Sequence, residues 1–179
     1  MRISRATALL LLLAPLLALG QAFEHEVKAA YLFRFLSFIE WPQSSFARPD
    51  TPLTIGVLGG DDVLSELRAI VPGRVVQGRP ISVQRLQGLE GRQGEALAGL
   101  HVLYVGRGAS GVLPKLASAK GLLVVSDSEL GLEQGAVVNF VRSEGRVRFE
   151  VAVDAAESRG LKISSRMLAV ASYVRPGKL

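Results

Sequence analysis

The stretch LTIGVLGGDDVLSELRAIV, residues 53–71, decides the class of fold. Leu53–Leu58 is almost continuously apolar, which predicts a short strand buried on both faces. Residues 59–62 then turn the chain, and Asp62 is available to cap a helix. Apolar side chains recur at helical spacing after this turn, at Val63, Leu64, Leu67, Ile70 and Val71. A buried strand that leads directly into a helix indicates an α/β protein.

The same alternation of strand and helix continues towards residue 125. Three more strands are predicted at Pro80–Leu86, His101–Val105 and Leu122–Val125. Helices are predicted between them at Glu90–Leu97 and Val112–Ala119. This order is typical of a parallel sheet with helices on both faces.

The C-terminal part of the chain has a different pattern. Ala136–Arg142 and Arg146–Val153 alternate between apolar and polar residues, and Ser143-Glu144-Gly145 joins them, which predicts a β-hairpin. Two final helices are predicted at Ala155–Arg159 and Ser165–Val174, capped by Asp154 and Ser164. We therefore expect a single three-layer α/β/α sandwich over residues 23–179, with a mixed, mostly parallel sheet and a C-terminal β-hairpin plus helices.

The first 22 residues have the pattern of a secretory signal peptide. Arg2 and Arg5 precede an apolar run, Ala6–Leu19, and small residues then occupy the first and third positions of Gly20-Gln21-Ala22. The run is shorter than the roughly 20 residues of a membrane-spanning helix, so we predict cleavage rather than anchoring. The mature chain is expected to be exported, and the loss of two arginines lowers its formal net charge from +5 to +3.

Composition gives little support to nucleic-acid binding or to disulfide bonding. The cations are scattered and do not alternate with aromatic residues, so a pI near 10.0 is weak support for a nucleic-acid partner. The chain has no cysteine, and 49% of its residues are hydrophobic. We therefore expect the fold to be stabilised by burial of apolar side chains alone.

The glycine-rich segment Gly106–Gly111 matches the pattern G-x-G-x-x-G and follows a predicted strand. Asp127 ends the next strand, near the spacing of a ribose-binding carboxylate in dinucleotide folds. However, the pattern follows the third strand rather than the first, and in a chain with 19 glycines chance alone explains such a match. The dinucleotide enzyme is therefore the least favoured hypothesis, and the alternative is a turn whose amides hold an anion.

A polar segment, Ser126–Glu129, follows the fourth strand at the sheet edge where ligands gather in such folds. Ser126 and Asp127 are its candidate ligand contacts, although a capped loop explains the same residues. The two histidines, His25 and His101, lack cysteines or carboxylates at metal-ligand spacing. We therefore predict no metal site, no catalytic residue and no cofactor.

The segment KAAYLFRFLSFIEWP, residues 28–42, predicts a helix whose apolar residues cover about half of its circumference. Lys28 falls within this apolar arc, and we expect its ammonium to reach water past Glu24. Phe33 and Trp41 lie on the other half, among polar residues. Either a second layer covers these aromatic side chains or they contact a partner protein, and they are our candidate partner-binding residues.

Taken together, an ordered set of segments resembles the YfiR family of small periplasmic proteins. The segments are Val27–Leu32, Glu40-Trp41-Pro42, Leu53–Gly59, Val125-Ser126-Asp127, Gly135, Asn139-Phe140, Arg146–Glu150 and Gly160–Ser165. The founding member of the family looks like a periplasmic repressor of a membrane-bound diguanylate cyclase, and the repression ends when an outer-membrane lipoprotein captures the repressor. The resemblance thus implies a periplasmic regulator without catalytic activity.

The partners that the resemblance implies are the periplasmic domain of an inner-membrane diguanylate cyclase or sensor kinase, an outer-membrane lipoprotein and a second copy of the chain. Two features differ from the family pattern. Family members often carry disulfide cysteines, which this chain lacks, so redox control does not transfer. Many also have asparagine two residues after the Arg-Phe-Glu glutamate, where this chain has Ala152.

Overall fold

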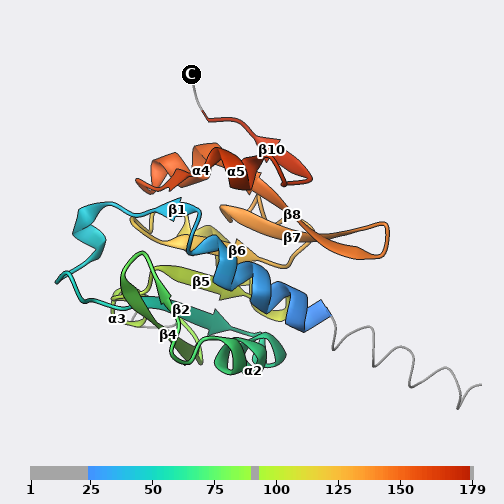
Figure 1. The fold of residues 1–179 in the computed structure, drawn as a ribbon. Coiled ribbons are helices and arrows are strands. Elements are labelled where there is room, and N and C mark those ends of the chain that lie inside the picture. Colours follow the sequence, from blue (N-terminus) through green and yellow to red (C-terminus); the bar gives the residue numbers. More distant parts are fainter. Residues whose placement is uncertain (1–23, 90–92, 178–179) are drawn as a thin grey trace, which may run out of the picture.

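An eight-stranded sheet forms the centre of the computed structural model, which describes residues 24–89 and 93–177 (Figure 1). The strands lie in the order β10-β8-β7-β6-β5-β2-β4-β3. Their bounds are β2 (Leu53–Leu58), β3 (Val75–Val76), β4 (Arg79–Leu86), β5 (Val102–Val105), β6 (Leu123–Ser126), β7 (Val138–Ser143), β8 (Arg146–Ala152) and β10 (Tyr173–Arg175). The predicted signal peptide, residues 1–22, lies outside the described residues.

Strand direction confirms the mixed, mostly parallel sheet that the sequence predicts. Strands β4, β2, β5, β6 and β7 are parallel neighbours, and β10 is parallel to β8. Strand β8 pairs antiparallel with β7, and β3 pairs antiparallel with β4. The turn between β7 and β8 has Glu144 and Gly145 at φ 53° and 73°, as a two-residue hairpin turn requires.

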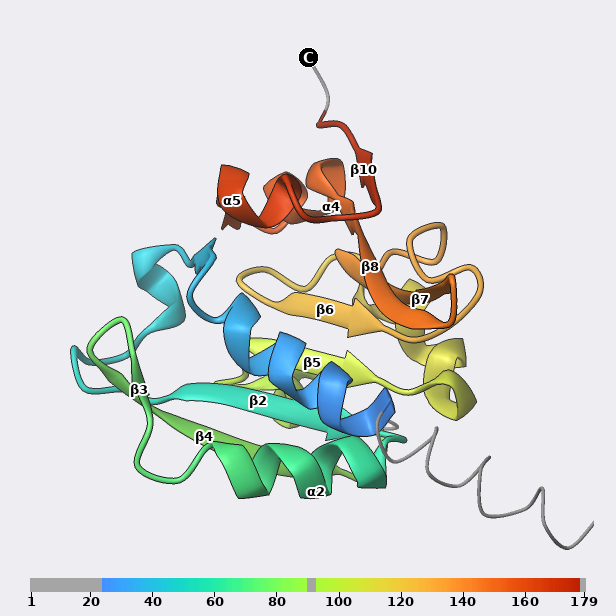
Figure 2. The ribbon, with the colours of Figure 1, turned by 45° about the vertical axis from the view of Figure 1, so that its right-hand side comes forward.

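Helices cover both faces of the sheet and so form the three predicted layers (Figure 2). The opening helix (residues 24–35) and α2 (Asp61–Ile70) pack on the face that carries Ile55, Val57 and Tyr104. On the opposite face, α3 (Gln93–Leu97) and the 3₁₀ helix η2 (Arg107–Leu116) pack against Leu103 and Val105. The short helices α4 (Val153–Ser158) and α5 (Ser165–Leu168) join the first of these two cores.

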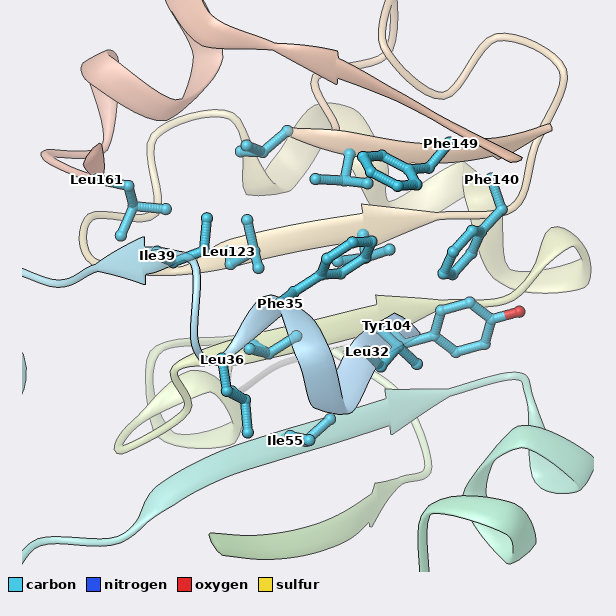
Figure 3. Packing of buried hydrophobic residues seen from close by; sticks show 14 of the residues in the cluster. Leu32, Phe35, Leu36, Ile39, Ile55, Tyr104, Leu123, Phe140, Phe149 and Leu161 are labelled. Carbon is cyan, nitrogen blue, oxygen red and sulfur yellow. The ribbon is translucent and has the colours of Figure 1, made fainter. Parts of the chain in front are cut away.

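The opening helix contributes aromatic side chains to the core over the β7–β8 hairpin (Figure 3). The rings of Phe35 and Phe149 meet edge-to-face with centroids 5.1 Å apart, and Phe35 stacks on Phe140 at 6.1 Å. After the helix, β1 (Ile39–Glu40) pairs antiparallel with β9 (Lys162–Ile163). A 3₁₀ turn, η1 (Gln43–Ser45), then leads towards β2. This segment is therefore a buried layer of the fold and not an added surface helix.

Two of the three predicted helix caps are wrong. Helix α2 begins at Asp61 with Gly60 at the cap position, so Asp62 lies inside the first turn, where its charge still favours the helix dipole. Helix α4 begins at Val153, so Asp154 is also inside the helix. Only the Ser164 cap is confirmed, because its hydroxyl accepts a hydrogen bond from the amide of Arg166.

Three predicted helices differ in kind or length from those observed. The opening helix, predicted over residues 28–42, ends at residue 35, and Ile39–Glu40 forms strand β1 instead. The segment predicted as a helix at Val112–Ala119 forms η2 instead, since its glycines and Pro114 disfavour a regular α-helix. The final helix ends at Leu168 rather than Val174, because Tyr173 and Val174 leave it to form edge strand β10. Helix α3 begins at Gln93, and the start of the helix predicted from Glu90 lies outside the described residues.

Candidate functional site

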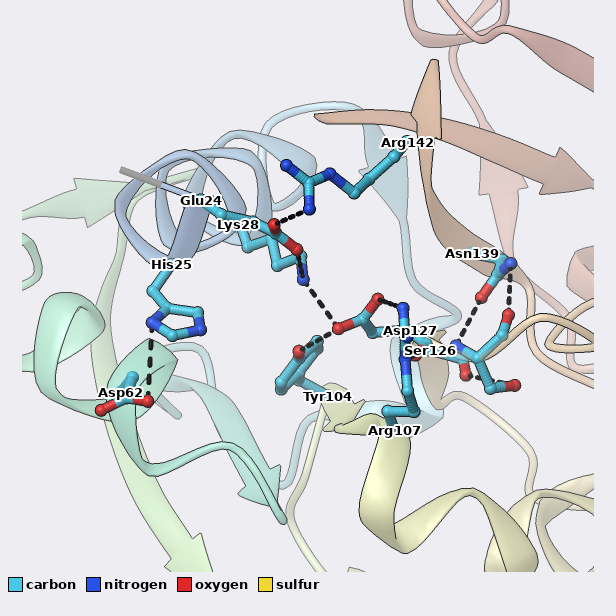
Figure 4. Close-up of polar contacts among 11 residues, drawn as sticks. Glu24, His25, Lys28, Asp62, Tyr104, Arg107, Ser126, Asp127, Asn139 and Arg142 are labelled. Atoms are coloured by element: carbon cyan, nitrogen blue, oxygen red, sulfur yellow. Dashed lines mark hydrogen bonds and ion pairs between the residues drawn. The ribbon is translucent and has the colours of Figure 1, made fainter. Parts of the chain in front are cut away.

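A buried lysine connects the opening helix to the carboxyl end of the sheet (Figure 4). The Nζ atom of Lys28 lies 2.5 Å from Glu24 Oε1, one helical turn earlier, and 2.7 Å from Asp127 Oδ2, which directly follows β6. Lys28 is only 4% exposed. The prediction that its ammonium reaches water past Glu24 is therefore wrong, because a second carboxylate lies beneath the helix. We call Glu24, Lys28 and Asp127 the carboxylate clamp.

Three further side chains surround the carboxylate clamp. The hydroxyl of Tyr104 donates to Asp127 Oδ2 at 3.5 Å. Arg107 Nη2 lies 3.8 Å from Asp127 Oδ1, and Arg142 Nη1 lies 3.4 Å from Glu24 Oε2. The two arginine side chains are 67% and 62% exposed, so they form the rim of the site while the ammonium forms its floor.

Two groups of the site, Glu24 of the clamp and the adjacent Tyr104, have pKa values shifted away from neutrality. Burial alone would raise the pKa of Glu24, but the hydrogen bond and charge of Lys28, together with the charge of Arg142, hold that pKa below its ordinary value. Burial raises the pKa of Tyr104, and the charge of Asp127 raises it further. Glu24 is therefore an anion near neutral pH, and Tyr104 is a protonated phenol that can only donate to Asp127.

A cavity of about 280 Å³ opens beside the clamp. Its lining residues are Glu24, Lys28, Arg107, Asp127, Glu129, Phe140, Val141, Arg142 and Val147. Charges of both signs thus face one apolar wall. The volume is close to the lower limit of small-molecule pockets, so the cavity suits a small polar molecule.

The two predicted ligand contacts have different environments. Asp127 lines the cavity, whereas Ser126 is fully buried with its hydroxyl 3.4 Å from that of Ser128. Asn139 fixes the loop here: its side-chain oxygen accepts from the amide of Ser128, and its Nδ2 donates to the carbonyl of Ser128. Ser126 therefore belongs to the packing of the loop and does not line the cavity.

Most of the side chains that surround Asp127 were not predicted from the sequence to lie near it. Glu24, Lys28, Arg107 and Arg142 come from the opening helix, from η2 and from β7, which are far apart in the sequence. One signal was present, since a lysine inside an apolar helical arc needs a buried partner when that arc is packed against a sheet. Its partner could not be identified from spacing alone.

The glycine-rich segment is explained by packing between two turns. The amide of Gly106 donates to the carbonyl of Leu58 at 2.8 Å. A Cβ atom at Gly106 would overlap the carbonyl oxygen of Gly59, whereas one at Gly108 or Gly111 would meet nothing within 4 Å. The turns after β2 and β5 thus need a glycine at position 106 in order to touch, and packing explains this glycine without a bound nucleotide.

Trp41 lies in the core at the opposite end of the sheet, next to His101. Trp41 is 8% exposed, and its indole Nε1 donates to the carbonyl of His101 at 3.2 Å. The imidazole Nδ1 of His101 accepts from the amide of Thr54, its Nε2 lies 3.1 Å from the carbonyl of Ser45, and its ring stacks on Phe46. Burial lowers the pKa of His101. The neutral imidazole therefore has a structural role, at the strand end where catalysis was not expected.

Phe33 and Trp41, the predicted partner contacts, thus differ in how much surface they offer. Phe33 is half-buried and packs against the core, and the guanidinium carbon of Arg74 lies 5.9 Å from its ring centroid. Trp41 offers almost no surface. Contact of either residue with a partner stays a prediction, and Phe33 is the more accessible of the two.

Two structural features are absent from the part of the chain that the structure describes. Residues 24–89 and 93–177 contain no group of three or more histidine, aspartate or glutamate side chains that could hold a metal ion. In the same part of the chain, no helix has the length and hydropathy needed to cross a bilayer.

Comparison with known proteins gives one family match. The model of the DUF4154 family, described as YfiR/HmsC-like, matches residues 25–172. The matched range includes Lys28 and Asp127 of the carboxylate clamp and ends just before β10. No curated protein matches the chain.

Proposed function

This chain belongs to the YfiR/HmsC-like family, and on that premise we propose that it represses a membrane-bound diguanylate cyclase by binding the periplasmic domain of that enzyme. Family membership supports a periplasmic regulatory role that works through a partner protein. The proposal adds the identity of the regulated enzyme and the sign of the effect. A sensor kinase in place of the cyclase, capture by an outer-membrane lipoprotein and self-association are further partner interactions within the same proposal.

The observation that best supports a non-catalytic role is the protonation state of the groups around the clamp. A general acid or base works best when its pKa lies near the operating pH. Here the pKa of Glu24 is lowered and that of Tyr104 is raised, so both groups move away from neutrality. The Nζ atom of Lys28 is bound between two carboxylates, so its hydrogen-bond donors are occupied. Such an arrangement fixes the opening helix and is poorly suited to proton transfer.

Direct binding is the step to test first. Purified residues 23–179 are mixed with the periplasmic domain of the inner-membrane cyclase or sensor kinase encoded beside this chain, and binding is measured by calorimetry. We expect a saturable complex with a dissociation constant of about 1 μM or below. An unrelated periplasmic domain is the matched control. Absence of binding to the neighbouring domain, or equal binding to both domains, would contradict the proposal.

Export of the chain is a second part of the proposal. We expect the mature protein in a periplasmic extract to begin at Phe23, or within a residue or two of it, because residues 1–22 have the pattern of a cleavable signal. N-terminal sequencing of the extracted protein checks this. Recovery of uncleaved chain in the membrane fraction would contradict both the cleavage site and the periplasmic location.

A small-ligand-binding module is the second candidate, and the cavity beside the clamp favours it. Arg107 and Arg142 at its rim could bind an anionic group, while Glu129 could bind a cationic one. If this candidate is correct, at least one member of a panel of small anionic metabolites should raise the melting temperature of the wild type but not of Arg107→Ala, and NAD and NADP are tested separately. A shift with NAD or NADP would revive the enzyme hypothesis instead.

A further inference from the structure

The hairpin strands and β10 present a second charged surface, on the side of the sheet opposite the aromatic core. Along β8, Val147, Phe149 and Val151 turn towards the core, so Arg146, Arg148 and Glu150 point to the other side. Neighbouring strands continue this surface, because Val141 pairs with Arg148, and Tyr173 of β10 pairs with Glu150. We call Val141, Arg146, Arg148, Glu150 and Tyr173 the outer strand face. Its hairpin end projects from the body of the molecule (Figure 1).

The arginines of the outer strand face differ from the charged groups of the carboxylate clamp, because their side chains form no ion pairs among the residues that the structure describes. The side chains of Arg146 and Arg148 are both exposed and form no ion pair or hydrogen bond with another described residue, although their backbone pairs with β7. Arg142 on the neighbouring strand, by contrast, pairs with Glu24. At the other end of the face, burial raises the pKa of Glu150, and the nearby charge of Glu133 raises it further. The face is therefore basic towards the hairpin tip and acidic towards β10.

The residue types of this face are those that contribute most to protein interfaces. Tyr173 is 51% exposed, although tyrosine contributes a large, rigid contact area when a partner covers it. Arginine side chains bind carboxylates through two parallel hydrogen bonds, which a lysine cannot do. Two arginines without ion-pair partners among the described residues, together with an exposed tyrosine on the same face, can thus provide both an apolar anchor and a specific charge contact.

We propose that the outer strand face is the docking surface for an acidic segment of a partner protein, with Arg146 and Arg148 binding its carboxylates and Tyr173 packing against its apolar side chains. The inference rests on the proposed function and names the surface and the partner charge that this function needs. A protein segment fits better than an anionic bilayer. Glu150 and Glu133 would repel a uniformly negative surface, whereas a segment with its acidic residues at one end can match both ends of the face.

Charge reversal tests the proposal against a matched control. The variant Arg146→Glu/Arg148→Glu is compared with Arg68→Glu/Arg166→Glu, which makes the same change in net charge at exposed residues of α2 and α5. The probes are the periplasmic domain of the neighbouring inner-membrane protein and vesicles that contain phosphatidylglycerol. We expect the first variant to bind the domain roughly tenfold to hundredfold more weakly, and the control to bind like the wild type.

Each outcome of this experiment decides a separate point. If the wild type binds the domain and Arg146→Glu/Arg148→Glu binds it equally well, the docking surface is overturned while the proposed function stands. If the wild type does not bind the domain at all, the proposed function itself fails. Vesicle binding that the first variant loses, with domain binding unchanged, would assign the face to lipid and overturn the proposal. Tyr173→Ala, with an unchanged melting temperature, should also weaken domain binding, which separates loss of contact from loss of fold.

Discussion

The segment that contains the opening helix, residues 24–41, is held differently at its two ends. At the amino end the ammonium of Lys28 is buried between two carboxylates, whereas at the carboxyl end Trp41 packs against His101 and donates to its backbone carbonyl. The first arrangement joins residues of opposite charge across the sheet edge. The second uses an indole and a neutral imidazole that each bind a backbone group. The stability of the two ends should therefore respond differently to truncation of a side chain, to removal of a charge and to pH.

The energetic difference follows from the cost of burying charge. An intact buried ion pair contributes little net stability, because desolvation offsets most of the attraction, yet removal of one partner leaves an uncompensated charge. Apolar burial and a satisfied backbone bond, by contrast, stabilise the fold directly. The clamp thus specifies where the opening helix lies, while the Trp41 end supplies more of the free energy that keeps it there.

The largest effect is expected from Trp41→Ala. Truncation leaves a cavity in the core and removes the hydrogen bond to the carbonyl of His101, so the free energy of unfolding should fall by about 3–5 kcal/mol. Phe33→Ala is the matched control, and because its ring is half-buried we expect a loss of about 1 kcal/mol. Denaturant unfolding measures both values.

The same pair of variants also tests the partner contact predicted from the sequence. If Trp41→Ala lost binding to the neighbouring periplasmic domain without loss of stability, Trp41 would belong to an exposed contact surface. Such a result would contradict the packing described here. If Phe33→Ala alone weakened binding, with its stability nearly unchanged, the opening helix would be part of the interface.

A smaller but still large effect is expected from Lys28→Met. The change leaves Glu24 and Asp127 buried without their cation, and we expect a loss of about 3 kcal/mol. Adding Asp127→Asn to this variant should cost less than the sum of the two single changes, because the two residues interact directly. If the losses of the two single variants summed to the loss of the double variant, Lys28 and Asp127 would not interact energetically.

The smallest of the three effects is a difference in pH dependence between the two ends. The folded pKa of His101 lies below its ordinary value of 6.5, so the stability that its neutral form contributes is complete above that pH and is lost as the pH falls below it. The folded pKa of Glu24 lies below 4.5, so its contribution is lost only at more acidic pH. The Trp41 end should therefore weaken first on acidification.

The variant His101→Asn isolates this effect. An asparagine side-chain oxygen can accept from the amide of Thr54 without titrating, so the melting temperature should fall less than that of the wild type between about pH 7 and pH 5.5. Melting curves at several pH values measure the two slopes. Equal slopes would show that His101 does not cause the loss of stability in this range.

A feature of the fold could be predicted from the sequence when the contacts that determine it lie between residues close together in the chain. The six predicted strands, the β7–β8 hairpin and the Ser164 cap follow from neighbouring residues, and the structure confirms them, whereas the short strands β1, β3, β9 and β10 were not predicted. The end of the last helix did not follow, because Tyr173 leaves it only when an adjacent strand, β8, offers hydrogen-bond partners. The partner of Lys28 could not be found either, since Asp127 approaches it only after the sheet has formed. Long-range pairing was the missing information in each case.

The central claim is that this chain represses a diguanylate cyclase by direct contact, and one measurement tests it most directly. A full-length diguanylate cyclase whose periplasmic domain binds the chain is reconstituted in lipid nanodiscs, where both sides of the membrane are accessible, and formation of cyclic di-GMP from added GTP is followed as purified residues 23–179 are added. The account predicts that product formation falls and levels off when the chain saturates the cyclase. Product formation that stays unchanged at saturating binding, or that rises, would contradict it.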